Sequence, residues 1–510
     1  MTMTHAGLPD TWLWFSLALM SLAVIWILLR TSGHSSTQRF INVERIPVLG
    51  QMARLFAISP WPLLILKFIS VGLFLTVIAA GLFGTLIPER NLATTLTWTV
   101  WWAGLIITVF FLGSAWCAVC PWDTIASWLV KHRLWRRADE TSSLGFKVPK
   151  AWRNVWPALA MFVGLTWLEL GIGVTTSPYA TAVLSLVMIV LATIYMAVFE
   201  GKAFCKHVCP VGRTVGFYAQ LSMLELRPRQ QQTCDDCTTM ECYHGTKEIE
   251  PCPTHLVMGS LKQSTYCTSC SACTMSCPHD NVGWRVRSPA VEAIQHARPH
   301  WDEAWFMLGL LGLTTFHGIT MMEFWEQGLS SFGQLIGDSG QLIWSFSVGM
   351  AIVFFAPILL YSLLIKLTQV LIPVAIDFKQ LFAKLAFVSL PLAFVYHIAH
   401  NLNHLIRESR GFTEVLMNPL GRGSLPLSSH ELHMRHMNPL ISEQLLYGLQ
   451  AGLMIFGFWL ALQILQRRTM EGLKAQDTLR SYYLLPGIIF ISSVTAFNLW
   501  LLVQPMIMRM

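Results

Sequence analysis

The sequence contains the stretch CTSCSACTMSCP at residues 267–278, in which four cysteines follow the spacing C-x2-C-x2-C-x3-C and a proline follows the last. This spacing is that of the bacterial [4Fe–4S] ferredoxin run, where three close thiolates hold one cluster and the fourth ligates the other cluster. A second set lies just upstream and consists of Cys234, Cys237, Cys242 and Cys252-Pro253. Its middle gap is longer, but the same three-plus-one pattern is present.

Crossed pairing of these eight cysteines predicts two [4Fe–4S] clusters. The first cluster is expected to use Cys234, Cys237, Cys242 and Cys277. The second is expected to use Cys252, Cys267, Cys270 and Cys273. Two zinc sites are the alternative, because four thiolates also suit zinc. The Cys-Pro endings and the crossed spacing favour the clusters.

Outside this region the chain is strongly apolar. Of its 510 residues 54% are hydrophobic and 12% are charged, whereas soluble domains carry about 25% charged residues. Apolar runs long enough to cross a bilayer are expected at 12–29, 64–87, 95–116, 154–172, 179–199, 303–323, 341–365, 383–405, 443–466 and 482–504. The predicted fold class is therefore an all-α polytopic membrane protein of about ten transmembrane helices, with an inserted cytoplasmic ferredoxin-like segment that holds two [4Fe–4S] clusters.

The basic residues predict the orientation. With the N-terminus outside, 28 Lys and Arg residues fall in inside loops and six fall outside, as the positive-inside rule requires. The net charge of +7 is thus explained by topology and not by nucleic-acid binding. We expect a multi-pass protein of the bacterial inner (cytoplasmic) membrane, with a cytoplasmic Fe–S segment and periplasmic termini. Its predicted regions are an N-terminal membrane domain at 1–200, the cytoplasmic segment at 201–300 and a C-terminal membrane domain at 301–510.

Four further cysteines lie at the inner ends of two predicted helices. Cys117-x2-Cys120-Pro121 follows the third span, and Cys205-x3-Cys209-Pro210 follows the fifth. Disulfides are rare on the cytoplasmic side, which favours metal or redox use. The two pairs are predicted either to share one cluster or metal ion or to form separate dithiol redox centres. Two helix-ending turns with incidental thiols are the structural alternative.

These motifs resemble those of the NosR/NapH/CcoG group of membrane polyferredoxins, over roughly residues 60–290. The resemblance implies electron transfer between the quinone pool or a cytoplasmic donor and a periplasmic acceptor, or support of a copper enzyme. The chain differs from the group in its first pair, which is spaced CxxC and not CxxxC, and in the five helices expected after the cluster segment.

Histidines gather near the opposite, outer end of the predicted bundle. His397, His400 and His404 recur at i, i+3 and i+7 and so share one helix face. Together with His317 they are candidate ligands of a haem b or a metal ion, because imidazole suits haem iron, copper and zinc. A later outside loop contains three more candidates, for copper: His430, His433 and His436. The alternative is that these histidines bond to carbonyl groups and that the loop is a solvated surface.

Together these features predict a membrane electron-transfer protein that connects cytoplasmic-side clusters to a periplasmic-side acceptor, through haem b or copper at the outer histidines. The expected partners are membrane lipid, a quinone or cytoplasmic electron donor, and a periplasmic redox protein or metalloenzyme. A copper reduction, delivery or assembly factor is the alternative function, and a redox-sensing regulator is a third. No catalytic residue is assigned, because the sequence contains no nucleophile–base pattern, phosphate loop or paired carboxylates.

Overall fold

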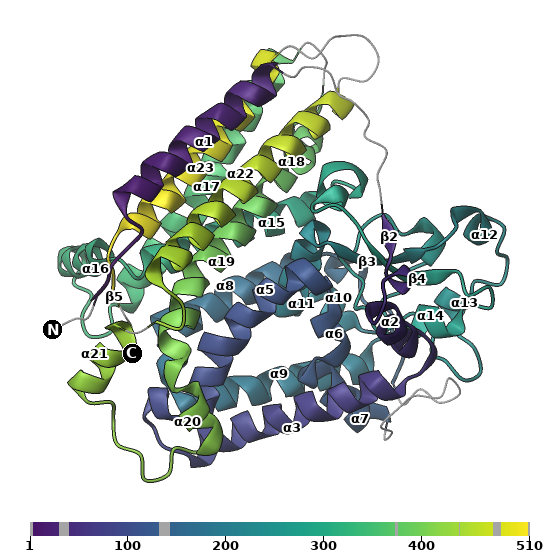
Figure 1. Ribbon diagram of the computed structural model, residues 1–510, viewed down its shortest axis with the longest axis horizontal. Helices are drawn as coiled ribbons and strands as arrows, with labels where there is room; N and C mark the ends of the chain where they lie inside the picture. Colours follow the sequence, from purple (N-terminus) through teal and green to yellow (C-terminus); the bar gives the residue numbers. More distant parts are fainter. Residues whose placement is uncertain are drawn as a thin grey trace.

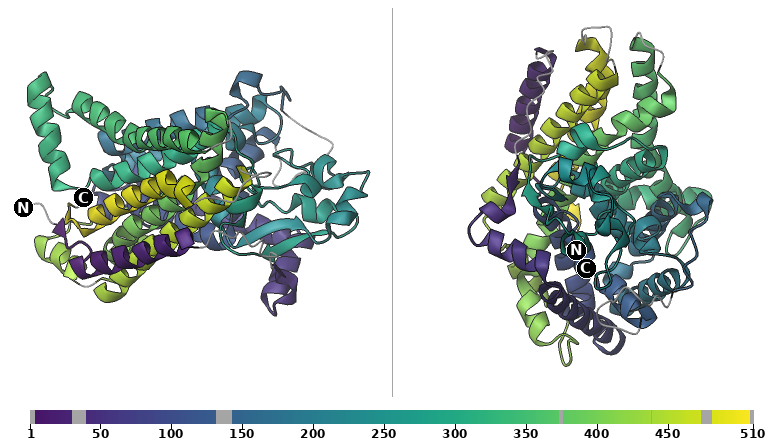
Figure 2. Two further views of the ribbon diagram at one scale, coloured as in Figure 1. Left: turned by 90° about the horizontal axis from the view of Figure 1, so that it is seen from above. Right: turned by 90° about the vertical axis from the view of Figure 1, so that its right-hand side faces the viewer.

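The computed structural model describes residues 4–29, 40–131, 143–372, 376–437, 439–472 and 481–507. Long helices run alongside one another, and a cysteine-rich segment projects from one end of the bundle (Figure 1; Figure 2). We call that end the cluster end, and it carries α12 (Gln231–Asp235), α13 (Glu241–His244), α14 (Ala272–Ser276), β2 (Ile41–Asn42), β3 (Leu224–Pro228) and β4 (Val282–Val286). Both termini lie at the opposite end, near α16 (Glu323–Ile336), α20 (Phe412–Met417) and α21 (Ser429–Met437) (Figure 1). We call it the histidine end. There β1 (Thr4–His5) pairs antiparallel with β5 (Met506–Ile507).

Eight helical stretches in the described residues are long and apolar enough to cross a membrane. They are α1 (Asp10–Leu29), α3 (Trp61–Phe83), α4–η3–α5 (Leu92–Leu112), α9 (Pro178–Val198), α17 (Ile343–Leu371), α18–α20 (Phe378–Met417), α22 (Glu443–Gly472) and η11–α23 (Tyr482–Val503). The other two expected spans also form helices, α8 (Trp156–Gly171) and α15 (Trp301–Ile319). However, α8 has only 16 residues and α15 begins with two carboxylates. The all-α polytopic fold is confirmed, whereas the count of ten is not.

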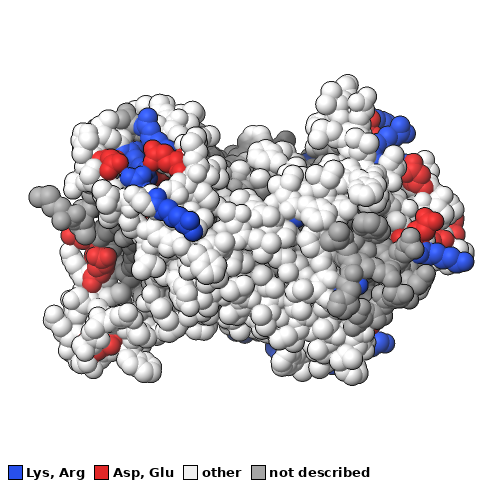
Figure 3. All heavy atoms as spheres, turned by 90° about the horizontal axis from the view of Figure 1, so that it is seen from below, with Lys and Arg blue, Asp and Glu red and all other residues white. Residues whose placement is uncertain are grey.

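The outer surface and the interior of the bundle differ in the way a lipid environment requires. On the face in Figure 3, charged side chains gather at the two ends and leave an uncharged band between them. Large apolar side chains of the membrane-length helices point outward, such as Ile69 in α3, which is 61% exposed, and Ile352 in α17, which is 65% exposed. By contrast α19 (Ser389–Glu408), which carries three histidines, is almost wholly buried among α5, α15 and α22. A helix with such polar side chains is expected to face the protein interior and not lipid.

The cluster end is built from two separate parts of the chain. β4 (Val282–Val286) is the middle strand of a three-stranded antiparallel sheet, between β3 (Leu224–Pro228) and β2 (Ile41–Asn42). The nearby α2 (Leu49–Ile58) contacts α14 (Ala272–Ser276), where the Thr274 hydroxyl donates to the Ala57 carbonyl at 3.1 Å. The segment that contains β2 and α2, between α1 and α3, therefore helps to hold the ferredoxin-type cysteines in place.

Close backbone approaches join this segment to the helices. Gly216 in α11 (Pro210–Tyr218) lies so close to the loop before Cys267 that a Cβ there would be 2.1 Å from the Thr265 carbonyl oxygen. Gly201, just after α9, has φ +64°, and its Cβ would lie 2.6 Å from the Pro253 carbonyl oxygen. Glycine is needed at both positions, because a side chain would push the cysteine loops away from the bundle.

Candidate iron–sulfur and histidine sites

The structure brings together the four cysteines predicted for the first cluster, which we call set A. A common cavity is lined by Cys234, Cys237, Cys242 and Cys277. Asn281 bridges two of them, since its side-chain amide donates to Cys234 Sγ at 3.3 Å and its backbone N–H donates to Cys277 Sγ at 3.4 Å. Burial, with the nearby Cys277 and Cys237 thiols, raises the pKa of Cys234. The crossed arrangement expected from the sequence is therefore the arrangement in the structure.

The second predicted set, which we call set B, is more deeply buried. Burial, followed by the neighbouring thiols of Cys270, Cys267 and Cys252, raises the pKa of Cys273. Burial likewise raises the pKa of Cys267 to about 11, with Cys270 and Cys252 among its neighbours. These four cysteines, although up to 21 positions apart, thus face one another. A thiolate is the form that binds iron, so a positively charged metal centre would offset the cost of burying four of them.

The loops around these cysteines adopt unusual backbone conformations. Between Cys234 and Asn281, five non-glycine residues have positive φ, between 46° and 59°: Met240, His255, Ser269, Ser271 and Asp280. Such conformations cost free energy and collect at functional sites. They turn backbone N–H groups toward sulfur: Leu256 donates to Cys252 Sγ at 3.3 Å and Ser269 donates to Cys267 Sγ at 3.5 Å. Hydrogen bonds to ligand sulfur atoms are one means by which proteins set cluster potentials.

The remaining four cysteines also come together, and we call them the membrane-edge set: Cys117, Cys120, Cys205 and Cys209. Cys117 lies in the one-turn helix α6 (Ala115–Val119), Cys120 precedes α7 (Pro121–Lys131), and Cys205 lies in α10 (Ala203–His207). Cys209 caps α11, and its sulfur accepts the Gly212 N–H at 3.3 Å. Burial, and then the adjacent Cys209, raises the pKa of Cys117 to about 12. The two pairs, which are 85 residues apart along the chain from Cys120 to Cys205, thus lie next to each other in the structure.

Buried charges surround the membrane-edge set. The Lys202 ammonium pairs with Asp123 at 2.7 Å, and Asp123 lies 3.7 Å from Cys205 Sγ. Arg213, 2% exposed, donates to the Cys205 carbonyl and to the Thr265 carbonyl, each at 2.9 Å. Burial alone lowers the pKa of Lys202, but Asp123, Cys205 and Cys270 together raise it. Lys202 therefore lies near sulfur atoms of both the membrane-edge set and set B.

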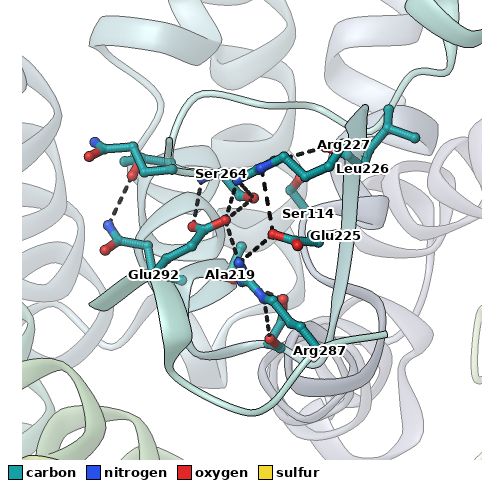
Figure 4. Close-up of polar contacts among 12 residues, drawn as sticks. Ser114, Ala219, Glu225, Leu226, Arg227, Ser264, Arg287 and Glu292 are labelled. Atoms are coloured by element: carbon teal, nitrogen blue, oxygen red, sulfur yellow. Dashed lines mark hydrogen bonds and ion pairs between the residues drawn. The ribbon is translucent and has the colours of Figure 1, made fainter. Parts of the chain in front are cut away.

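A buried ionic network fixes set B to the sheet and the bundle (Figure 4). Glu292 forms ion pairs with Arg227 and with Arg287, the latter at 2.5 Å. Its other oxygen accepts the Ser264 N–H at 2.7 Å, and the Ser264 carbonyl accepts the Cys267 N–H at 3.0 Å. Arg287 also pairs with Glu225 at 2.7 Å. The charges are paired throughout, as buried ions require.

At the histidine end, three of the four predicted histidines form a contiguous row. The ring centroids of His317 and His400 are 5.7 Å apart, and those of His400 and His404 are 5.1 Å apart. His397 is nearer the cluster end, with its Nδ1 3.4 Å from the Tyr218 hydroxyl and its ring against Trp102. His404 contacts Glu408 through Nδ1 at 2.6 Å and Met321 Sδ through Nε2 at 3.1 Å.

The loop histidines are placed differently. His430 and His433 lie exposed on the short helix α21 (Ser429–Met437), while the side chain of His436 lies outside what the structure describes. The described side chains of α21 include Arg435, which pairs with Glu414 at 3.5 Å, and Glu431, which pairs with Arg90 at 3.2 Å. The structure does not bring His430 or His433 into the row of buried histidines.

A tryptophan-lined cavity between the membrane-edge set and the histidines was not predicted from the sequence. A cavity of about 80 Å³ is lined by Trp98, Trp101, Trp102, Trp122, Phe162, Thr166, Glu169, Pro210 and Val211, among others. The π-helix η3 (Thr95–Trp101) supplies two of these indoles, and π-helical turns often occur at functional sites. The indole N–H groups of Trp101 and Trp122 are buried without a hydrogen-bond partner in the described structure.

Glu169 is the residue that sequence reasoning missed. It lines the tryptophan cavity, the small cavity beside His397 and His400, and a cavity of about 160 Å³ at the histidine end. It has no hydrogen-bond or ion-pair partner among the residues that the structure describes. The signal was present, because a single carboxylate within an expected membrane span is a functional hypothesis by default.

In the described part of the chain, no three His, Cys, Asp or Glu side chains are already close enough to hold one metal ion. In a [4Fe–4S] cluster each thiolate binds a different iron, so the sulfur atoms do not have to meet at one point. The fit of the cysteine sets to such clusters therefore rests on their grouping, on the shared cavity of set A and on the hydrogen bonds to sulfur.

Fold and cysteine sites together define an all-α polytopic membrane protein with a ferredoxin-like iron–sulfur segment. A family model described as "4Fe-4S binding domain" matches residues 94–138 and 181–222. These two segments contain the membrane-edge set and not sets A and B. The recognition of the chain as a polyferredoxin-like membrane protein is confirmed.

Two curated relatives match parts of the chain. "Putative electron transport protein YccM" of Escherichia coli (strain K12) is 27% identical over 118 residues, which cover 22% of this chain and 30% of that protein. "Methylamine utilization ferredoxin-type protein MauN" of Paracoccus denitrificans (strain Pd 1222) is 27% identical over 179 residues, which cover 31% of this chain and 56% of that protein. The chain thus spans less than two thirds of either relative. No solved structure gives a significant match.

Proposed function

We propose that this protein transfers electrons in a membrane, between [4Fe–4S] sites at its cluster end and an acceptor at its histidine end. The 4Fe-4S family match and the names of the two relatives, an electron transport protein and a ferredoxin-type protein, support this function. When bound, such clusters accept and release single electrons. The observation that carries the proposal is the contact between the loops of two cysteine sets. The Ser114 hydroxyl, three residues before Cys117, lies 2.9 Å from the Ser269 hydroxyl, which directly precedes Cys270.

In this proposal sets A and B each hold one cluster, and the membrane-edge set holds a third. The protein supplies the thiolates, the N–H groups that donate to sulfur, and the buried cations Lys202 and Arg213, which offset thiolate charge. Hydrogen bonds and burial of this kind set the potentials. The match of the 4Fe-4S family model to the two segments with the membrane-edge cysteines supports the third site.

The tryptophan cavity supports a quinone as the electron donor. Its walls are mostly apolar, and the unpartnered N–H groups of Trp101 and Trp122 can donate to quinone oxygens. A quinol that loses two electrons, one at a time to the clusters, also loses two protons. The Glu169 carboxylate on the cavity wall can accept them in turn, releasing the first into the cavity at the histidine end, which it also lines, before it takes the second. Trp122 lies two residues beyond Cys120 and Val211 two residues beyond Cys209, so a bound ring would be close to the membrane-edge set.

The acceptor is placed at the histidine end because a bilayer core of about 30 Å separates the two ends of the bundle. A haem b or copper ion held by His317, His397, His400 or His404 would lie between the clusters and a periplasmic redox protein or metalloenzyme. This assigns the cluster end to the cytoplasm and the termini to the periplasm, as the distribution of basic residues predicts.

Metal analysis with EPR on protein purified without oxygen tests this function. Three clusters require about twelve irons per chain and two require about eight. We expect about twelve, reduced-state [4Fe–4S] signals, and cluster reduction by a quinol analogue such as duroquinol. Zinc in place of iron, or clusters that dithionite reduces but no quinol or soluble donor reduces, would contradict the proposal.

A second candidate function is reduction or delivery of copper to a metalloenzyme. The observation that favours it is the approach of Met321 Sδ to within 3.1 Å of His404 Nε2, because thioether and imidazole together suit copper. Copper bound without electron transfer to an external acceptor would favour this function over the first.

A further inference from the structure

The contact between Met321 and His404 is not an ordinary hydrogen bond. Met321 lies two residues beyond the end of α15, and His404 lies in the last turns of α19, 83 residues later. Their Sδ and Nε2 atoms are 3.1 Å apart. A thioether sulfur is only a weak acceptor. The separation is nevertheless close to the typical N–H···O distance of about 2.9–3.0 Å, although sulfur is a much larger atom than oxygen.

The other side of His404 explains which lone pair faces the sulfur. Its Nδ1 lies 2.6 Å from Glu408 Oε1. In the neutral imidazole only one nitrogen carries a proton, and the carboxylate favours the tautomer in which Nδ1–H donates to it. In that tautomer Nε2 presents a lone pair to the thioether, so the two atoms can hold a cation between them. A carboxylate that accepts from the second nitrogen is also the usual companion of a histidine that binds a metal ion.

His400 supplies a third donor. Its side chain is 2% exposed, and neither ring nitrogen has a hydrogen-bond partner in the described structure. Buried polar groups are normally satisfied, so an orphaned imidazole calls for an explanation. Its ring centroid lies 5.1 Å from that of His404. Two imidazoles on one ion have centroids roughly 5–6 Å apart, because each metal–nitrogen bond is about 2.0–2.1 Å long.

The site is reachable from the histidine end. The cavity of about 160 Å³ is lined by Met321, His404 and Glu408, and it extends to the Pro88–Glu89 turn. Two arginines also line it, but both are engaged: Arg407 pairs with Glu443 at 3.0 Å and Arg435 pairs with Glu414 at 3.5 Å. An entry path and paired neighbouring charges are what a metal site in this position requires.

We propose that Met321, His400 and His404 bind one Cu(I) ion, with Glu408 as the positioning residue that fixes the His404 ring. The thioether selects a soft ion, and Cu(I) is the soft ion that also accepts imidazole. The set reaches three donors only when the methionine is counted. This site would serve the second candidate function, copper reduction or delivery, and the role of the site rests on that function. Copper binding is measured independently of the iron–sulfur clusters.

The test uses the full chain in detergent, purified without oxygen and titrated with Cu(I) against the chelator bicinchoninate. We expect one tightly bound Cu(I), with sulfur and nitrogen neighbours in its X-ray absorption spectrum. Met321→Leu and His404→Gln should abolish tight binding, and Glu408→Gln should weaken it by about 10- to 100-fold. Met417→Leu, at an 87% exposed methionine of α20, is the matched control and should change nothing. His433→Gln tests the loop histidines of α21 directly and should leave copper bound.

Four results would overturn the proposal: no retained Cu(I), copper lost in His433→Gln but kept in Met321→Leu, zinc bound in place of copper, or a b-type haem spectrum that disappears in His404→Gln. Iron content is measured in every variant. Unchanged iron in Met321→Leu shows that the chain is folded, so a failure of copper binding is distinct from a failure of the cluster function.

Discussion

The Lys202 ammonium lies 2.7 Å from Oδ2 of Asp123. Asp123 follows the first membrane-edge cysteine pair and Lys202 precedes the second, so this ion pair joins the two halves of the membrane-edge set. The Lys202 side chain is 9% exposed and the Asp123 side chain is 5% exposed. Removing one partner of a buried pair is costly, because the other charge remains buried without compensation. The pair therefore holds the two cysteine turns in register.

Asp123→Asn is expected to lower the free energy of unfolding by about 3–5 kcal/mol, because Lys202 stays buried beside an uncharged amide. Unfolding in detergent, followed by tryptophan fluorescence, measures the change. The double variant Asp123→Asn/Lys202→Met should recover most of the loss. Glu414 is 64% exposed and pairs with Arg90 and Arg435. Glu414→Gln is the control, because water reaches this carboxylate, and its expected change is about 0–1 kcal/mol. Wild-type stability in Asp123→Asn would show that the pair does not hold the set.

Cys205→Ser is expected to remove one cluster and leave the other two. The iron content should fall by about four atoms per chain, because one of four thiolates of the membrane-edge set is lost. EPR of the reduced protein should lose one component and retain the others. Cys237→Ser, in set A, is the matched comparison and should remove a different component. If both variants lose the same component, the membrane-edge set does not hold a separate cluster.

Glu292→Gln is expected to destabilise set B. It leaves Arg227 and Arg287 without one of their carboxylates, at a cost of about 3–5 kcal/mol for a buried network. Because Glu292 also holds the Ser264 N–H that precedes Cys267, cluster iron should be lost at a lower denaturant concentration than in the wild type. The control is Arg229→Met, whose partners Glu44 and Asp280 are more exposed. Loss of iron at the same concentration in Glu292→Gln and the wild type would contradict this role.

The cysteine groups were predictable because cluster ligands follow local spacing. The crossed grouping of Cys277 with Cys234 was expected from the Cys-Pro endings, and the structure brings these cysteines to one cavity. Their cluster-binding role stays a prediction. The meeting of the two membrane-edge pairs depends on how α7 packs against α9 and α6 against α11. The sequence left two separate dithiols open as an alternative.

Features that depend on packing between distant helices were not predictable. His404 was expected at the same end as His317, which lies four residues before Met321. The 3.1 Å contact between Met321 and His404 depends, however, on the packing of α15 against α19. The π-helix at Thr95–Trp101 could not be predicted, because a continuous apolar run shows no periodicity that would distinguish it from an α-helix. The amphipathic helix α16 (Glu323–Ile336) was not expected either, because only long apolar runs were counted.

Glu169→Gln is expected to slow cluster reduction by a quinol analogue by about 10²- to 10⁴-fold, the usual contribution of a positioned proton acceptor. The glutamine keeps the shape of the side chain but cannot take a proton from the quinol ring. Reduction by dithionite needs no such proton transfer and should keep its wild-type rate. Stopped-flow absorbance of the clusters measures both reactions. The matched control is Glu326→Gln on the exposed face of α16, which should leave both rates unchanged. Equal slowing of the quinol and dithionite reactions in Glu169→Gln would mean that the clusters, and not the quinone site, were damaged. An unchanged quinol rate would remove Glu169 from the proton path.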